Sequence, residues 1–189
     1  MKKLFLLLTL SLFTLSFVNA QEEKEEEIVY SENIQDTFFG VKFGASREEV
    51  IKAFEKEGLI LNRQYSTKSE VSFVPYGDYF SFGGMDWNFV NVLFSNDKFY
   101  GIYFGYTPEN KKTALDYFET VLSALSSKYK MNAKSIEDEN IYKTYVATDR
   151  DKKFVAVQCA KDESHDGEMR YYVGLIYGDD TLDKPSDEL

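Results

Sequence analysis

The sequence Tyr100-Gly101-Ile102-Tyr103-Phe104-Gly105-Tyr106-Thr107 decides the fold, because similar phrases occur before and after it. Residues 39–46 read Phe-Gly-Val-Lys-Phe-Gly-Ala-Ser, and residues 174–180 read Gly-Leu-Ile-Tyr-Gly-Asp-Asp. Each phrase has the form of a strand that ends in glycine before a helix-capping residue, and the first two lead into amphipathic helical patterns. The recurrence predicts an α+β protein of two related units, each a helix packed on an antiparallel β-sheet meander.

The first predicted unit begins near Thr37 and contains a short helix. Ser46-Arg47-Glu48-Glu49 is a capping box, and an apolar stripe of Val50, Ile51 and Phe54 stops at Gly58. The pattern predicts a helix over 46–57. Short apolar runs separated by turn signals then predict an antiparallel meander with strands at 71–76, 79–82, 87–94 and 99–106.

The second predicted unit begins with a longer helix. Thr107 is the expected N-cap, with Pro108 in the first turn, where proline is favoured. Apolar residues at three- and four-residue spacing from Ala114 to Tyr129 predict an amphipathic helix of about 22 residues. Three strands follow, and the predicted organisation is a signal peptide at 1–20, an acidic flexible leader at 21–36, helix-plus-sheet units at 37–106 and 107–178, and an acidic tail at 179–189.

The amino terminus has the layout of a secretory signal peptide. Lys2 and Lys3 precede an apolar run over 4–18, which ends in the small-residue sequence Val18-Asn19-Ala20. This run is shorter than the roughly 20 residues that span a bilayer. Gln21 stands where a lipoprotein would have cysteine. We therefore expect an exported, periplasmic or extracellular protein that is soluble, not lipidated and not inserted stably in a membrane.

Charge excludes one class of partner. The chain of 189 residues carries 22 basic and 32 acidic residues, a formal net charge of −10, and loses Lys2 and Lys3 with the signal peptide. Nucleic acids are bound through basic surfaces that neutralise phosphates, and no basic stripe is present. We expect no nucleic acid among the partners.

The opening Phe-Gly-Val-x-Phe-Gly-x-Ser-x-x-Glu-Val, at residues 39–50, is similar to the openings of many uncharacterised exported proteins of gut Bacteroidetes. The predicted helix-then-strands unit, used twice over residues 37–178, resembles the beta-lactamase inhibitory protein fold. Inhibitors of that group grip their target with the exposed face of the sheet and adjacent loops, so the resemblance implies a protein-binding module. Those inhibitors carry disulfides in their repeats, whereas this chain has a single cysteine, Cys159.

The chain offers few groups for catalysis. It has one histidine and one cysteine, and no nucleophile-elbow, phosphate-loop or zinc-helix pattern. Cys159 lies in an apolar run and is predicted to be a buried small hydrophobe. Asp162, His165 and Asp166 are weak candidates for a metal site, the alternative being a solvated acidic hairpin loop. Asp149-Arg150-Asp151 is predicted to be a polar hairpin turn, and we expect neither catalytic residues nor a cofactor.

Aromatic residues give the stronger signal, because they make up 16% of the chain. Strand alternation predicts that one side of the sheet faces the helices with Tyr100, Ile102, Phe104, Tyr106, Val173, Leu175 and Tyr177. The opposite side then combines aromatic residues with glycines, which would leave shallow slots for a partner. Alternation along 87–94 also places Asn91 on that side. The predicted partner-binding residues there are Trp87, Phe89, Phe99, Tyr103 and Tyr172. The alternatives are that these aromatics fill the space over the glycines, or that the two units pack on each other there.

Three functions follow from these patterns. The first is a non-enzymatic module that binds another envelope or extracellular protein, or a second copy of itself, through the aromatic sheet face. The second is a binding protein for an apolar or sugar ligand held in an aromatic-lined cavity between helices and sheet. The third is a metal-dependent enzyme around His165.

Overall fold

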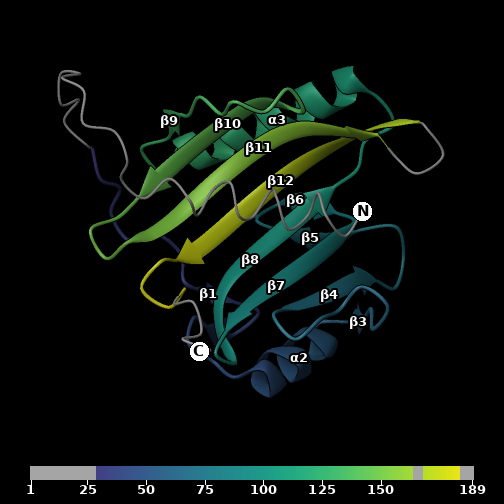
Figure 1. Ribbon diagram of the computed structural model, residues 1–189, viewed down its shortest axis with the longest axis vertical. Helices are drawn as coiled ribbons and strands as arrows, with labels where there is room; N and C mark the ends of the chain where they lie inside the picture. Colours follow the sequence, from purple (N-terminus) through teal and green to yellow (C-terminus); the bar gives the residue numbers. More distant parts are fainter. Residues whose placement is uncertain (1–28, 164–167, 184–189) are drawn as a thin grey trace.

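The computed structural model describes residues 29–163 and 168–183, and one eight-stranded antiparallel sheet dominates it (Figure 1). This confirms a mixed α+β fold with a mostly antiparallel sheet. The strands, in their spatial order, are β3 (Leu59–Leu61), β4 (Glu70–Pro75), β7 (Phe89–Ser95), β8 (Lys98–Tyr106), β12 (Met169–Asp179), β11 (Lys153–Glu163), β10 (Ile141–Thr148) and β9 (Asn132–Ala133).

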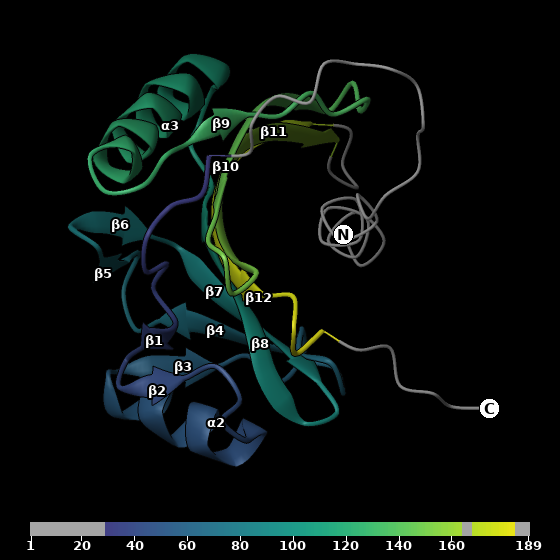
Figure 2. The same ribbon diagram turned by 90° about the vertical axis from the view of Figure 1, so that its left-hand side faces the viewer.

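One side of this sheet is covered. Helices α2 (Arg47–Lys56) and α3 (Lys111–Ser126) both lie on it, at opposite ends (Figure 2). Two small hairpins lie on the same side, β1 (Thr37–Phe38) with β2 (Val41–Lys42), and β5 (Phe80–Phe82) with β6 (Met85–Trp87). No helix in the described residues is long and apolar enough to cross a membrane.

Helix α2 forms where the sequence predicts it. The Ser46 side chain accepts a hydrogen bond from the Glu49 backbone N–H, and the Ser46 N–H donates to Glu49 Oε2 over 2.8 Å. This capping box satisfies two groups that a helix start leaves unpaired. Gly58 follows the helix with φ of 84°, a left-handed conformation suited to glycine. The predicted helix over 46–57 is confirmed.

Helix α3 begins later than predicted. Its N-cap is Asn110, whose Oδ1 accepts a hydrogen bond from the Thr113 N–H over 3.0 Å. The prediction of Thr107 as the cap is wrong, because the helix begins only at Lys111. The Thr107 N–H donates to Asn88 Oδ1 over 2.8 Å. That bond fixes the end of β8 to the loop before β7. The helix ends at Ser126 and is shorter than expected.

The first of the three similar phrases is a hairpin rather than a strand. Phe39 and Gly40 have φ values of 49° and 80°, so the chain turns between β1 and β2. The turn places Phe38 in the core, where its side chain is 1% exposed.

Residues 31–36 are held against the fold, contrary to the flexible leader predicted over 21–36. The Ser31 N–H donates to the Thr148 carbonyl over 2.8 Å, and Ser31 Oγ accepts from the Lys130 N–H over 2.8 Å. Ile34 is buried in the core. The signal peptide at 1–20, residues 21–28 of the leader and residues 184–189 of the tail lie outside the described residues.

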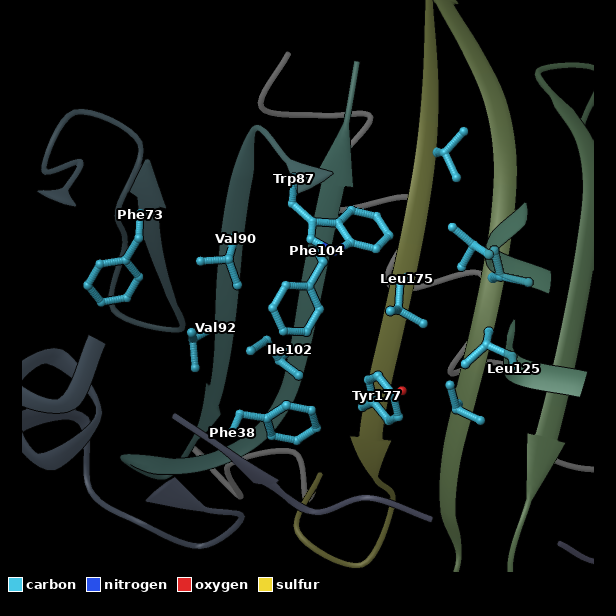
Figure 3. Close-up of a cluster of buried hydrophobic side chains, with 14 of the residues drawn as sticks. Phe38, Phe73, Trp87, Val90, Val92, Ile102, Phe104, Leu125, Leu175 and Tyr177 are labelled. Carbon is cyan, nitrogen blue, oxygen red and sulfur yellow. The ribbon is translucent and has the colours of Figure 1, made fainter. Parts of the chain in front are cut away.

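The main core fills the space between the sheet and its covering layer (Figure 3). Phe104 is at its centre, with its ring stacked on Phe82 at 4.1 Å and tilted against Trp87 at 5.9 Å. Val155, Val157 and Cys159 of β11 line the same side of the sheet. The predicted burial of Cys159 is confirmed, and this burial raises the pKa of its thiol to about 11.

Candidate functional site

The side of the eight-stranded sheet that faces away from α2 and α3 is the candidate site, and we call it the helix-free face. The sheet is curved and this face is its inner side, over which the described residues place no helix or strand (Figure 2). Its side chains form an apolar cluster separate from the main core. The cluster consists of Tyr103, Phe154, Ala156 and Ile176, with Phe89 and Val146 packed against it.

Cross-strand pairing arranges this face in rows. The middle row crosses the sheet from β4 to β10 and contains Ser72, Asn91, Tyr103, Ile176, Ala156 and Val146. In the row on either side, β8 and β12 place two glycines next to each other, Gly105 with Gly174 and Gly101 with Gly178. The Tyr103–Ile176 pair therefore stands between two pairs of glycines.

The space over these glycines is filled by side chains of neighbouring strands. A Cβ atom built on Gly105 would lie 2.1 Å from Phe89 Cζ, and one on Gly174 would lie 2.5 Å from Tyr103 Cε2. On Gly178 it would lie 2.3 Å from Phe154 Cε1. The prediction that these glycines leave open slots is wrong. Because glycine has no Cβ, each ring lies close over the backbone, as the alternative interpretation of the sequence had it.

Three of the five predicted partner-binding residues lie on the helix-free face. Phe89 and Tyr103 belong to its apolar cluster, and Tyr172 is the cross-strand partner of Ala160 on β11. Tyr103 is 4% exposed, and burial raises its pKa above the usual range. Tyr172 is half-buried, and burial together with the nearby Asp162 carboxylate raises its pKa.

Trp87 lies on the other side of the sheet, so its prediction is wrong. The predicted strand over 87–94 is interrupted, because β6 ends at Trp87 and β7 begins at Phe89. Trp87 belongs to the β5–β6 hairpin, which leaves the large sheet. Its side chain is fully buried, with the indole N–H donating to the Phe82 carbonyl over 3.1 Å.

Phe99 also lies in the main core rather than on the helix-free face. A β-bulge between Leu93 and Phe94 pairs Phe94 with Phe99 and Leu93 with Gly101. Tyr100 is the extra residue of this bulge, so the alternation that holds from Gly101 to Tyr106 does not extend back to Phe99. The prediction that Tyr100 faces the helices is also wrong, because Tyr100 lies near Glu70, which is on the helix-free side. Phe99 is fully buried, and its ring packs edge-on against Phe43 at 4.8 Å.

Two amide side chains on the helix-free face are buried, and within residues 29–163 and 168–183 each has an oxygen without a hydrogen bond. Asn91 of β7 is 6% exposed and Gln158 of β11 is 1% exposed. Gln158 Nε2 donates to Thr144 Oγ1 over 3.2 Å, but Gln158 Oε1 and Asn91 Oδ1 accept no hydrogen bond in the described part of the chain. Buried polar atoms in proteins are nearly always paired.

Two weak signals in the sequence concern these two residues. Alternation placed Asn91 on the correct side, although it was not among the predicted binding residues. Gln158 interrupts the apolar run from Phe154 to Ala160, and a polar residue within such a run is unusual. Neither signal shows that the two amides share one face.

A cavity lies beside the amino-terminal end of the described chain. This cavity of about 1220 Å³ is lined by the segment from Val29 to Thr37, by Lys128 and Lys130, and by residues of the β10–β11 turn. Asp36 lies 3.3 Å from both Lys42 and Lys153 there, and its hydrogen bonds with Thr37, Lys153 and Lys42 lower its pKa despite partial burial. The lining is charged and bears no resemblance to the predicted aromatic cavity.

The metal candidates are only partly described. Asp162 lies near the end of β11, while His165 and Asp166 fall outside the described residues. Within residues 29–163 and 168–183, no three His, Cys, Asp or Glu side chains are grouped so that they could hold a metal ion. Asp149-Arg150-Asp151 is a hairpin turn as predicted, with Asp149 Oδ1 accepting from the N–H groups of Asp151 and Lys153.

The chain matches no protein-family model, no curated protein and no solved structure. The function is therefore argued from the residues of the helix-free face.

Proposed function

We propose that this protein is an exported, non-enzymatic binding module that receives a segment of another envelope or extracellular protein on its helix-free face. The observation that carries the proposal is the pair of buried amide oxygens, Asn91 Oδ1 and Gln158 Oε1, on one side of the sheet. A buried acceptor without a donor costs about 1–3 kcal/mol. A partner that supplies donors at both positions recovers that cost on binding.

The surroundings of the two amides support a protein partner. Asn91 and Gln158 are three strand spacings apart, roughly 15 Å, with Tyr103 and Ile176 between them. A polypeptide segment spans this distance easily. Both oxygens are buried, so the side chains around them must move before the N–H groups of such a segment reach them. Apolar and aromatic side chains at the centre with hydrogen-bonding groups around them are typical of protein interfaces.

We also propose that residues 37–106 and 107–178 are two copies of one unit. The sequence Phe89-Val90-Asn91-Val92 is similar to Phe154-Val155-Ala156-Val157. Phe89 pairs with Gly105 and Phe154 with Gly178, and in both pairs the ring lies over the glycine. This equivalence supports the resemblance to the beta-lactamase inhibitory protein fold, whose inhibitors use the exposed sheet face.

The two other functions have less support. The space between the helices and the sheet, where an apolar or sugar ligand would bind, contains tightly packed rings such as Phe82 on Phe104. The metal-dependent enzyme depends on His165, which lies outside the described residues. Neither function accounts for the buried oxygens of Asn91 and Gln158.

Site-specific photo-cross-linking tests the proposed function. A photoreactive phenylalanine analogue replaces Tyr172, on the helix-free face, or Tyr65, an exposed tyrosine of the β3–β4 connection. The mature chain, residues 21–189, is then irradiated in envelope extract. We expect one discrete cross-linked partner from position 172 and none from position 65.

Removal of the amides gives the second test. The variant Asn91→Leu, Gln158→Met replaces both amides with apolar groups of similar size and should fold at least as stably as the wild type. It should lose the cross-link from position 172. The matched control Gln64→Leu makes the same chemical change at an exposed site and should retain the cross-link. A cross-link that survives removal of both amides would contradict the proposal.

A further inference from the structure

We propose that the partner presents a positively charged segment, and that a lysine or arginine side chain of this segment enters an acidic corner of the helix-free face beside Asn91. The acidic corner consists of Glu70 and Asp183, which both act on the hydroxyl of Tyr100, and of Asp180, which interacts with Asp183. This inference rests on the proposed function and adds to it the chemical class of the partner.

The register of the sheet places the corner next to Asn91. Glu70 pairs with Leu93, and Ser72 pairs with Asn91, so Glu70 and Asn91 occupy neighbouring rows on adjacent strands. Diagonal neighbours of this kind lie about 7–8 Å apart, within reach of one long side chain. Gly178 pairs with Gly101, so the chain that follows β12 leaves the sheet beside Tyr100, and it bends toward the helix-free side (Figure 2).

Among residues 29–163 and 168–183, the charges that act at this corner are mainly negative. Glu70 on β4 and Asp183 after β12 both act on Tyr100 of β8, and together with burial they raise the pKa of its hydroxyl above the usual range. Asp183 and Asp179 act on Asp180 as negative charges, and Lys152 of the β10–β11 turn acts on it as a positive charge. In the described part of the chain, the negative charges of the corner thus come from β4 and from the end of β12.

The pKa shifts agree with this geometry. Burial raises the pKa of the Glu70 and Asp183 carboxyls. The pKa of Asp180 is also raised, mainly by burial and in addition by repulsion from Asp183 and Asp179. In the free protein, ionisation of these carboxyl groups at neutral pH is therefore less favourable than ionisation of the same groups in water. A cation placed among them reverses this cost, because an opposite charge within a few ångströms favours ionisation.

Asn91 gives an independent reason for the same ligand. Its buried Oδ1 needs a donor, and a guanidinium group carries five N–H donors in a planar fork. One arginine is long enough to donate to the Asn91 amide and to the Glu70 carboxylate at once. A second copy of this chain is the less suitable occupant, because its own net charge is negative.

Three peptides of equal length serve as probes, in which leucine alternates with arginine, glutamine or glutamate. Binding to the mature chain is measured by fluorescence anisotropy at neutral pH. The arginine peptide should bind at least about tenfold more tightly than the glutamine peptide, the effect of one charge-assisted hydrogen bond. The glutamate peptide should not bind.

Two charge-matched variants locate the interaction. The variant Glu70→Gln, Asp180→Asn, Asp183→Asn removes the corner, and Glu48→Gln, Glu55→Gln, Glu57→Gln removes the same charge from the exposed side of α2. The corner variant should lose about tenfold in affinity for the arginine peptide, while the α2 variant keeps the wild-type affinity. Binding should tighten as the pH rises from 4 to 7 and the corner ionises. Equal losses in both variants would mean that only net charge matters and would overturn the inference.

The outcomes separate this inference from the proposed function. If the glutamine peptide binds as tightly as the arginine peptide and cross-links to position 172, the helix-free face is a binding surface but does not select positive charge. If the natural partner cross-links from position 65 and not from position 172, the proposed function itself is wrong. Concentration-dependent dimerisation in sedimentation, abolished by Asn91→Leu, would identify a second copy as the occupant and overturn the inference.

Discussion

The Phe89 ring lies directly over Gly105, its cross-strand partner, so that a Cβ atom at position 105 would stand 2.1 Å from Phe89 Cζ. Phe154 and Gly178 repeat this relationship on β11 and β12, where the distance would be 2.3 Å. These ring-on-glycine contacts close the sheet surface with the protein's own side chains. Together with Tyr103 over Gly174, these contacts leave no room for a side chain at three glycines, although none of the three has a positive φ.

The variant Gly105→Ala should destabilise the protein by about 1–3 kcal/mol, because the new methyl group overlaps the Phe89 ring. Chemical denaturation of the purified variant measures the loss. Gly77→Ala is the matched control, since nothing lies within 4 Å of a Cβ there, and it should change the free energy of unfolding by less than about 0.5 kcal/mol. A positive coupling between Gly105→Ala and Phe89→Ala in a double-mutant cycle would identify the ring as the cause.

The variant Phe99→Ala should cost about 3–5 kcal/mol of unfolding free energy, because it empties a fully buried site between Phe43 and Phe94. Tyr172→Ala, at a half-buried position on the helix-free face, should cost about 1 kcal/mol or less. Thermal or urea unfolding distinguishes the two. If both variants lose a similar, small amount of unfolding free energy, Phe99 lies on the helix-free face, as the sequence predicted.

The variant Asn110→Ala should destabilise helix α3 by about 1 kcal/mol, because it removes the acceptor for the Thr113 N–H. Thr107→Ala should have an effect below about 0.5 kcal/mol, since Thr107 bonds to Asn88 through its backbone N–H, which alanine retains. Urea unfolding followed by circular dichroism provides the comparison. A larger loss of unfolding free energy for Thr107→Ala than for Asn110→Ala would show that the helix begins at Thr107, as the sequence predicted.

Because of the Cys159 thiol, the free energy of unfolding should decrease as the pH rises above about 8.5. Burial raises its pKa to about 11 in the folded protein, whereas an ordinary thiol titrates near pH 8.5. The unfolded chain therefore ionises first, and the contribution is present below about pH 8.5 and is lost as the pH rises toward 11. Compared with Cys159→Ala, the wild type should lose about 2–3 kcal/mol more between pH 8 and 11.

Thiol labelling gives an independent check of the same burial. A disulfide reagent at pH 8 should modify Cys159 only at the rate of unfolding, and rapidly in denaturant. Immediate labelling of the native protein would contradict the placement of Cys159 in the core.

Local sequence signals determined the parts of the fold that local interactions stabilise. The capping box of Ser46 and Glu49 fixes the start of α2 within one turn, and Gly58 ends the helix through its own φ angle. Hydrophobic alternation predicted most strands and assigned Phe89, Asn91, Tyr103 and Tyr172 to one side. These predictions succeed because side-chain direction along a regular strand depends only on the backbone.

Only the tertiary structure decided where that regularity ends. The bulge beside Phe94 turns Phe99 into the core, and the departure of the β5–β6 hairpin from the sheet does the same for Trp87. Neither event has a local signal, because both follow from strand pairing with distant residues. Likewise, the pairing of β8 with β12 places β7, which carries Asn91, and β11, which carries Gln158, in one sheet. The same pairing places the Tyr103 ring over Gly174. The sequence by itself thus determined the elements, and long-range packing determined the face on which binding is proposed.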